Sequence, residues 1–171
     1  MKLIKNISLL IGIFFCFNCF GSWVECNSPE GKCKVSFPSA PTHAKKLLSV
    51  SDTDNVAYDV YLSSADQKNF YLMMIATYPQ AIPENMHMVA LEGFVKGILS
   101  NRKDGKLVDA KLIEVKGSKG IQFFVEGEDR YFKGMTLVGE KNLYLIGVES
   151  MPMFFNEEEC SSFIESFDFV D

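Results

Sequence analysis

Side chains suited to acid–base or nucleophilic catalysis are scarce in this sequence. It contains two histidines, His43 and His87, so a Ser-His-Asp or Cys-His centre would have to use one of them. His43 follows the turn-forming segment SAPT and is expected in an exposed loop, whereas His87 is expected to pack, half-buried, beside the apolar face of a helix. The motifs G-x-S-x-G, H-E-x-x-H, G-x-G-x-x-G and the Walker A loop do not occur. We therefore predict no catalytic residue, no cofactor and no enzymatic activity.

Acidic residues form two short clusters that could offer oxygen ligands to a cation. Glu126, Glu128 and Asp129 fall at a predicted turn, and three consecutive glutamates occupy positions 157–159. Neither cluster has the D-x-D-x-D-G spacing with a distal glutamate that a calcium loop requires. A solvated turn and the favourable interaction of acids with a helix start explain both clusters, so we predict no metal-binding residue.

Three cysteines follow the amino-terminal segment: Cys26, Cys33 and Cys160. The first two enclose NSPEGK, whose serine, proline and glycine favour a turn between two β-prone stretches. Because a hairpin would bring the two thiols across from each other, we predict a disulfide between Cys26 and Cys33. A redox or zinc pair is disfavoured, since the spacing matches neither C-x-x-C nor a zinc knuckle. Cys160 is expected to be a buried thiol, with an intermolecular bridge as the alternative.

The amino-terminal segment has the pattern of an export signal. Lys2 and Lys5 precede an apolar run at 7–17, which spans about 16 Å as a helix and falls short of a bilayer core of about 30 Å. We predict a signal peptide over residues 1–21, cleaved after Gly21, and a single mature domain over 22–171. Lipidation of Cys19 is the alternative, although asparagine precedes it where a small residue is usual. The expected location is periplasmic or secreted, with membrane attachment only if Cys19 is lipidated.

Alternating apolar residues predict most of the strands of the mature domain. Residues 55–62 place apolar side chains on one face, and residues 70–78 are apolar on both faces, so together they predict a hairpin whose second strand is central. The short connections among the last predicted strands make them antiparallel neighbours. The other expected strands are 33–37, which ends at a proline-bounded turn, and 112–115, 120–125, 131–138 and 143–148.

Two amphipathic helices are expected to cover this sheet. Prolines 79 and 83 open the first, which runs to about Arg102 with apolar residues at spacings of three and four. Gly93 and Gly97 in its middle each cost about 1 kcal/mol of helix stability relative to alanine. Either the helix packs closely against a neighbour at these positions, or the helix prediction is weak there. The second helix starts at Asn156, an N-cap to which Glu159 reaches back. The predicted fold class is α+β: an antiparallel sheet of about six to eight strands with a central helix and a carboxy-terminal helix packed on it.

The two ends of the predicted domain resemble a known family. KVSFPSAP at 34–41 and EECSSFIESFDFV at 158–170 bracket a meander with one central helix. This order is similar to that of small exported bacterial proteins of the PsbP and DcrB-like α/β/α sandwich class. The resemblance implies a PsbP-like sandwich that binds and stabilises partners rather than catalysing a reaction. It is carried by core and turn positions: Phe37, Pro38, Pro41, Phe163, Ser166 and Phe167.

Charge and composition narrow the class of partner. The chain has 17 basic and 22 acidic residues and a net charge of −5, so no basic face suited to a phosphate backbone is expected and nucleic acid is an unsuitable partner. We predict a non-enzymatic interaction or assembly module of the bacterial cell envelope, with an unidentified envelope protein as partner. The alternative is a carrier of a small apolar ligand or peptide, held in a groove of the aromatic-rich sheet.

One loop is a candidate for contact with that partner. Met151, Met153, Phe154 and Phe155 precede the second helix, in a loop that has no obvious need for so many large apolar side chains. Docking beneath the last helix is one explanation. A contact surface rich in adaptable methionine is the other.

Overall fold

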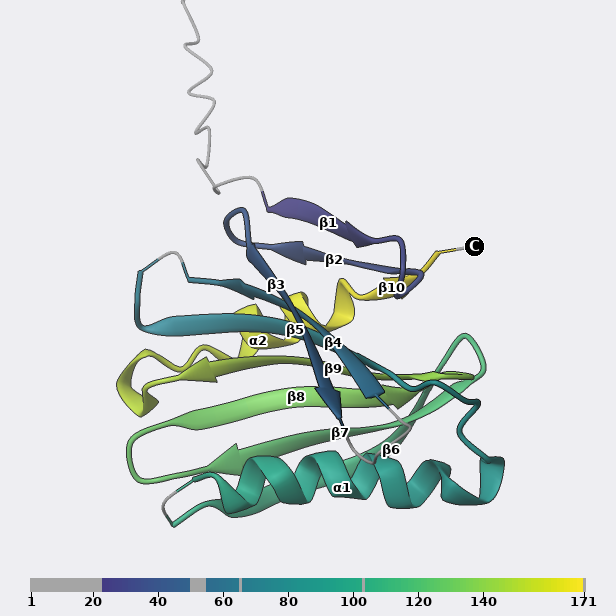
Figure 1. The fold of residues 1–171 in the computed structure, drawn as a ribbon. Coiled ribbons are helices and arrows are strands. Elements are labelled where there is room, and N and C mark those ends of the chain that lie inside the picture. Colours follow the sequence, from purple (N-terminus) through teal and green to yellow (C-terminus); the bar gives the residue numbers. More distant parts are fainter. Residues whose placement is uncertain (1–22, 50–54, 65, 103, 171) are drawn as a thin grey trace, which may run out of the picture.

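The fold is a twisted seven-stranded antiparallel sheet with a helix on each face (Figure 1). The computed structural model describes residues 23–49, 55–64, 66–102 and 104–170. The strand order in the large sheet is β3, β4, β5, β9, β8, β7, β6. This arrangement confirms the predicted α+β class and the antiparallel sheet. The strands are β3 Thr42–Ser49, β4 Asn55–Ser63, β5 Asn69–Thr77, β6 Lys106–Val115, β7 Ser118–Glu126, β8 Tyr131–Val138 and β9 Asn142–Ser150.

The alternation read from the sequence sets which face each strand residue occupies. In β5, Tyr71, Met73 and Ile75 pack on one face of the sheet, whereas Leu72 and Met74 point to the other. Strand β5 pairs with β4 on one side and with β9 on the other, so it is central, as its apolar character predicts. Each face therefore has its own hydrophobic core.

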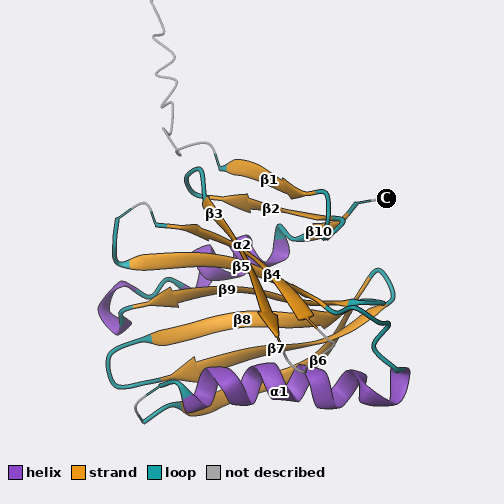
Figure 2. Ribbon diagram, in the orientation of Figure 1, coloured by secondary structure: helices purple, strands orange, loops and turns teal. Residues whose placement is uncertain are grey.

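Helix α1 (His87–Ser100) covers part of one face, as Figure 2 shows. A 3-10 turn, η1 (Glu84–Met86), precedes it and starts after Pro83, so the proline opens the helical segment as expected. Leu91 and Val95 are the buried residues of α1, and they pack against β7 and β8. The helix ends at Ser100, two residues before the expected boundary at Arg102.

The opposite face is covered by helix α2 and a small second sheet. Helix α2 (Glu157–Glu165) begins after Asn156, whose side chain accepts hydrogen bonds from the backbone N–H groups of Glu158 and Glu159, which confirms the N-cap. The small sheet has the order β1, β2, β10, with bounds Val24–Ser28, Cys33–Phe37 and Asp168–Phe169. A short 3-10 turn, η2 (Pro152–Phe154), leads into α2.

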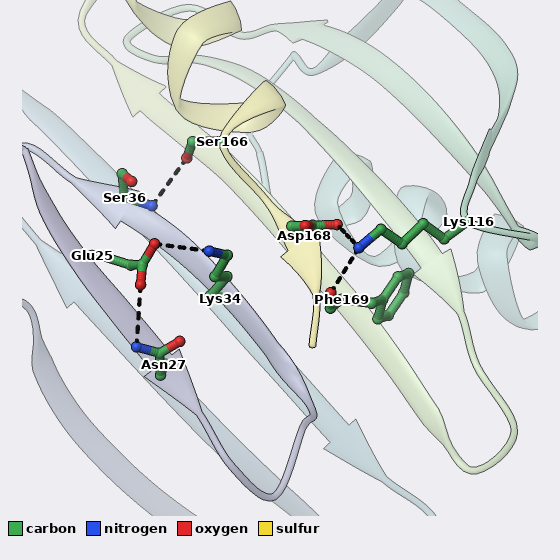
Figure 3. A network of polar contacts seen from close by, with 8 residues as sticks. All are labelled: Glu25, Asn27, Lys34, Ser36, Lys116, Ser166, Asp168 and Phe169. Carbon is green, nitrogen blue, oxygen red and sulfur yellow. Dashed lines mark hydrogen bonds and ion pairs between the residues drawn. The ribbon is translucent and has the colours of Figure 1, made fainter. Parts of the chain in front are cut away.

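Polar contacts attach the carboxy-terminal segment to the small sheet, as drawn in Figure 3. The backbone N–H of Ser36 in β2 donates to the Ser166 hydroxyl at 3.0 Å, just after α2. Lys116 Nζ lies 2.7 Å from Asp168 Oδ1 and 3.0 Å from the Phe169 carbonyl oxygen. The segment after α2 thus joins the small sheet to the β6–β7 turn, and it closes this face of the molecule.

Two strands differ from the sequence-based expectation. Strand β3, where we expected an exposed loop around His43, lies at one edge of the large sheet and is exposed along its whole length. Because neither of its faces is buried, it carries no alternating apolar pattern from which it could have been read. Strand β10 has two residues, too few for any periodicity, and together with β1 and β2 it forms a second sheet that was not expected.

The β1–β2 hairpin does not form the predicted disulfide. Its register pairs Cys26 with Val35 and Cys33 with Ser28, so the two thiols occupy diagonal positions. Diagonal residues are about 7–8 Å apart, beyond the roughly 4.4–6.8 Å between Cα atoms that a disulfide spans. Cys26, Cys33 and Cys160 are all free thiols in the structure, and Cys160 is buried as expected.

The predictions for the amino terminus, namely the signal peptide over 1–21, cleavage after Gly21 and lipidation of Cys19, lie outside the described residues. Within the described part of the chain, no helix is both long and apolar enough to cross a bilayer.

Candidate functional site

An open groove of about 970 Å³ lies between α1 and the neighbouring strands of the large sheet. Its floor consists of Phe132, Leu143 and Leu145, which are buried side chains of β8 and β9. Side chains of β4 and β5 form one wall, half-buried except for the exposed Leu62, and a strip of α1 forms the other. The residues of the β4–β5 wall are Tyr58, Leu62, Phe70, Leu72 and Met74, and those of the helix wall are Ala90, Gly93, Phe94, Gly97 and Ile98.

The groove exists because α1 covers only half of its face. The helix packs mainly on β7 and β8 and to a lesser extent on β9, so it leaves the side chains that β4 and β5 direct to this face only partly covered. Ala90, Gly93 and Gly97 recur at spacings of three and four, and this small-residue strip of the helix borders the groove. A narrow helix wall beside a partly covered half-sheet therefore leaves open volume.

Gly93 and Gly97 face open space rather than a close neighbour. A Cβ atom built on either glycine would meet nothing within 4 Å, apart from the helix itself and adjacent residues. The helix is regular through both positions. Neither explanation offered by the sequence is therefore correct, because the glycines mark neither close packing nor a weak helix. Because glycine has no side chain, the two positions leave the space beside the helix empty.

One end of the groove is polar and contains two arginines. Arg102 Nη2 lies 2.6 Å from Glu149 Oε2, and Arg102 Nη1 donates to the carbonyl oxygen of Ile98 at 3.0 Å. Burial lowers the pKa of Arg102, and the nearby Glu149 carboxylate opposes this shift. Arg130 lies with its guanidinium carbon 5.4 Å from the centroid of the Phe70 ring. An otherwise apolar channel thus ends in charged groups.

A second hollow of about 410 Å³ continues the groove at its other end. Tyr78 and Ala90 line both hollows. The second hollow is open and is lined by the 79–83 loop together with Met86 and Val89, which are mostly apolar residues. The combined channel therefore follows α1 from its carboxy-terminal end to its amino-terminal end.

The two histidines lie elsewhere and do not line this groove. His43 Nε2 lies 2.9 Å from Asp59 Oδ1, and the imidazole stacks on Tyr61 with ring centroids 4.3 Å apart. His43 is therefore a partly exposed residue of an edge strand with a buried carboxylate partner, not a loop histidine. His87 Nε2 lies 3.0 Å from the carbonyl oxygen of Ile82, which fits the expected packing role.

The acidic cluster at 157–159 is engaged with other protein groups. Glu157 pairs with Lys133, and Glu159 accepts a hydrogen bond from the Tyr71 hydroxyl instead of reaching back to the Asn156 cap as expected. Burial, followed by the Glu159 carboxylate, raises the pKa of Tyr71. Across the described residues, no group of three or more His, Cys, Asp or Glu side chains is placed to hold a metal ion.

The buried thiols are poorly suited to act as nucleophiles. Burial is the main cause that raises the pKa of Cys33 to about 12 and that of Cys160 to about 11, and it also raises the pKa of Cys26. Cys33 Sγ lies 3.9 Å from Met73 Sδ in the interior. Since the thiolate is the reactive form, these cysteines act as core residues near neutral pH.

The predicted contact loop is mostly occupied by interactions within the chain. The Phe155 ring stacks on Phe124 with centroids 5.1 Å apart, and Lys68 Nζ lies 4.3 Å from the centroid of Phe154. Met151 is half-buried, whereas Met153 has 81% of its surface exposed. Contact with a partner stays a prediction, and Met153 is the candidate that is freely accessible.

The sheet, its two helices and the open groove define an α+β sandwich with a cavity of ligand size. The structure of cyanobacterial PsbP (CyanoP) from Synechocystis matches it with a TM-score of 0.61 at 10% identity, covering 96% of this chain and 98% of that one. A Pseudomonas aeruginosa protein of unknown function gives a TM-score of 0.38 at 10% identity, over 78% of this chain and 85% of that one. No protein-family model and no curated protein matches the sequence. The fold is PsbP-like, which confirms the resemblance read from the two ends of the domain.

Sequence reasoning anticipated part of this site. The excess of aromatic residues left two interpretations open, core packing on both faces of the sheet or an apolar groove on one face, and Phe70, Tyr78 and Phe132 do line a groove. The arginines were missed because Arg102 and Arg130 belong to no motif and are 28 positions apart in the sequence. The available signal was the pair Gly93 and Gly97, at a spacing that places both on one side of a helix.

Proposed function

We propose that this protein is a non-enzymatic binding module of the bacterial cell envelope that carries an apolar ligand in the groove beside α1. The supporting observation is the groove itself. Its volume of about 970 Å³ falls in the range of small-molecule sites, and its buried floor is apolar. A few polar groups at one end of an apolar cleft are the usual composition of a ligand-binding site.

The glycines of α1 strengthen this proposal. Each costs roughly 0.5–1 kcal/mol of helix stability relative to alanine, and the open space beside them offers no compensating contact. A function that requires room beside the helix accounts for this cost. A scaffold that served only to expose its outer surface would not need it.

Export to the envelope rests on the amino-terminal sequence. Two lysines followed by the apolar run at 7–17 fit a signal peptide, and processing after Gly21 would release the described domain. Lipidation at Cys19 would instead tether the same domain to a membrane. Either route would bring the groove to a compartment where it can meet envelope lipids or peptides.

The experiment is a titration of the protein, purified from the envelope fraction of an expression host, with the neutral apolar fluorophore N-phenyl-1-naphthylamine. We expect saturable binding with one site per chain. Gly97→Phe should weaken it at least about tenfold, because the added ring occupies the groove. The control Lys96→Phe adds the same ring at an exposed position of α1 outside the groove lining, and it should bind within about twofold of wild type. Absence of saturable binding, or equal binding by Gly97→Phe, would overturn the proposal.

A further inference from the structure

We infer that the natural occupant of the groove is a single-chain amphiphile with a carboxylate head group, which lies at the arginine end while its hydrocarbon chain follows α1 toward Tyr78. This inference rests on the proposed function, because it specifies which ligand the groove takes. It is carried by the charge at one end of the channel and by the channel's length and apolar lining.

Arg102 supplies the first part of the head-group site. Its guanidinium carbon lies 4.8 Å from the centroid of Phe132, a residue of the groove floor. Two of its nitrogens donate to Ile98 and Glu149, but within the described chain its Nε has no hydrogen-bond partner although it is buried. The contacts with Ile98, Glu149 and Phe132 hold the positively charged Arg102 side chain at this end of the groove.

Arg130 supplies the second cation. It lines the same end of the groove, where its ring contact with Phe70 and a 3.3 Å hydrogen bond from Nη1 to the carbonyl oxygen of Lys68 hold it. Neither of these contacts neutralises its charge. A planar guanidinium also has the geometry to bind both oxygens of a carboxylate.

The charge balance at this end favours a monoanion. The residues of the groove lining that carry a charge near neutral pH are Arg102, Arg130 and Glu149. The single carboxylate of Glu149 pairs with Arg102, so the lining has one positive charge in excess. One ligand carboxylate would balance it, whereas a phosphate monoester would bring roughly two negative charges. The match is therefore better for a carboxylate.

The channel is long enough for one extended hydrocarbon chain. The length of the groove along α1, from Ala90 to Arg102, is about 18 Å at the helical rise of 1.5 Å per residue. The second hollow extends this length past Tyr78. An acyl chain spans about half of a 30 Å bilayer core, or roughly 15 Å. The side chains along this path are apolar, among them Phe94, Met74 and Ile82.

The test is competition against bound N-phenyl-1-naphthylamine by three probes that share a sixteen-carbon chain: palmitic acid, hexadecan-1-ol and hexadecyl phosphate. We expect palmitic acid to bind about tenfold or more tightly than the alcohol, and more tightly than the phosphate, because only the carboxylate matches the single excess charge. Arg130→Gln and Arg102→Gln should each reduce this preference to about twofold or less while the affinity for the alcohol is retained.

The control variant is Lys96→Gln, which removes one positive charge from an exposed position of α1 outside the groove lining. It should leave the preference for the acid unchanged. Equal affinity for acid and alcohol in the wild type, or an unchanged preference in Arg130→Gln, would overturn the head-group assignment and leave the proposed function standing. Tighter binding of the phosphate would overturn the choice of carboxylate. Failure of all three probes and of the fluorophore would instead contradict the proposed function.

Discussion

The two faces of the large sheet are covered to different degrees. On the α2 face, a helix and a three-stranded sheet together bury Tyr71, Ile146 and Phe163 to 2% exposure or less. On the α1 face, one helix packs mainly on β7 and β8 and to a lesser extent on β9, so Leu72 is half-buried and Leu62 keeps 40% of its surface exposed. The same sheet therefore has one face that is packed for stability and one face that retains room for a ligand.

This difference shows how a single sheet can serve two purposes. Stability scales with apolar area removed from water, and the α2 face, with two covering layers, removes nearly all of it. The incomplete cover of the α1 face gives up part of that stabilisation and leaves apolar surface exposed. Exposed contiguous apolar surface on a small domain marks a site of binding.

The largest expected effect comes from truncating one aromatic ring on each face. Phe163 has 0% exposure and contacts Phe37 and Tyr71 at ring-centroid distances of 5.2 Å, so Phe163→Ala should lower the free energy of unfolding by about 3–5 kcal/mol. Phe94 borders the groove and is half-buried, so Phe94→Ala should cost less than about 2 kcal/mol. Urea unfolding of both variants measures the difference, and equal losses would remove the contrast between the faces.

The next effect is an alkaline loss of stability that originates on the α2 face. Burial raises the pKa of Cys33 from 9.0 to about 12 in the folded chain. As the pH rises above about 9, the unfolded chain releases this proton first, so the free energy of unfolding falls by up to about 1.4 kcal/mol per pH unit until the folded thiol also ionises. Cys33→Ala, although less stable at pH 7, should show a shallower decline between pH 9 and 11 in urea unfolding. Parallel declines in the two proteins would assign the alkaline loss to other groups.

The smallest effect tests the open space of the α1 face. Gly93→Ala should raise the free energy of unfolding by roughly 0.5–1 kcal/mol, because alanine favours the helix and its Cβ meets no neighbour. The matched substitution Gly120→Ala should be destabilising, since a Cβ there would collide with the Thr136 carbonyl oxygen and the Leu137 side chain. Thermal unfolding of both variants provides the measurement. A destabilised Gly93→Ala would mean that the space beside α1 is filled.

Periodicity in the sequence predicted the strands that bury a face and missed those that do not. Strands β4, β5, β8 and β9 were found because their side chains alternate or are apolar throughout. The edge strand β3, which includes His43, has eight exposed residues and gives no such signal. The predicted disulfide failed for a related reason, because cysteine spacing indicates a hairpin but does not determine its register.

The sequence alone determined the α+β class, the central position of β5, the N-cap at Asn156 and the PsbP-like order of elements. These features depend on local preferences and on the pattern of apolar residues, which a chain carries in its sequence. Only the tertiary structure decided that α1 rests on β7 and β8, that Gly93 and Gly97 border open space, and that Arg102 and Arg130 meet at one end of it. Such features depend on where a helix settles across a sheet, and that position follows from the packing of residues far apart in the chain rather than from any local pattern.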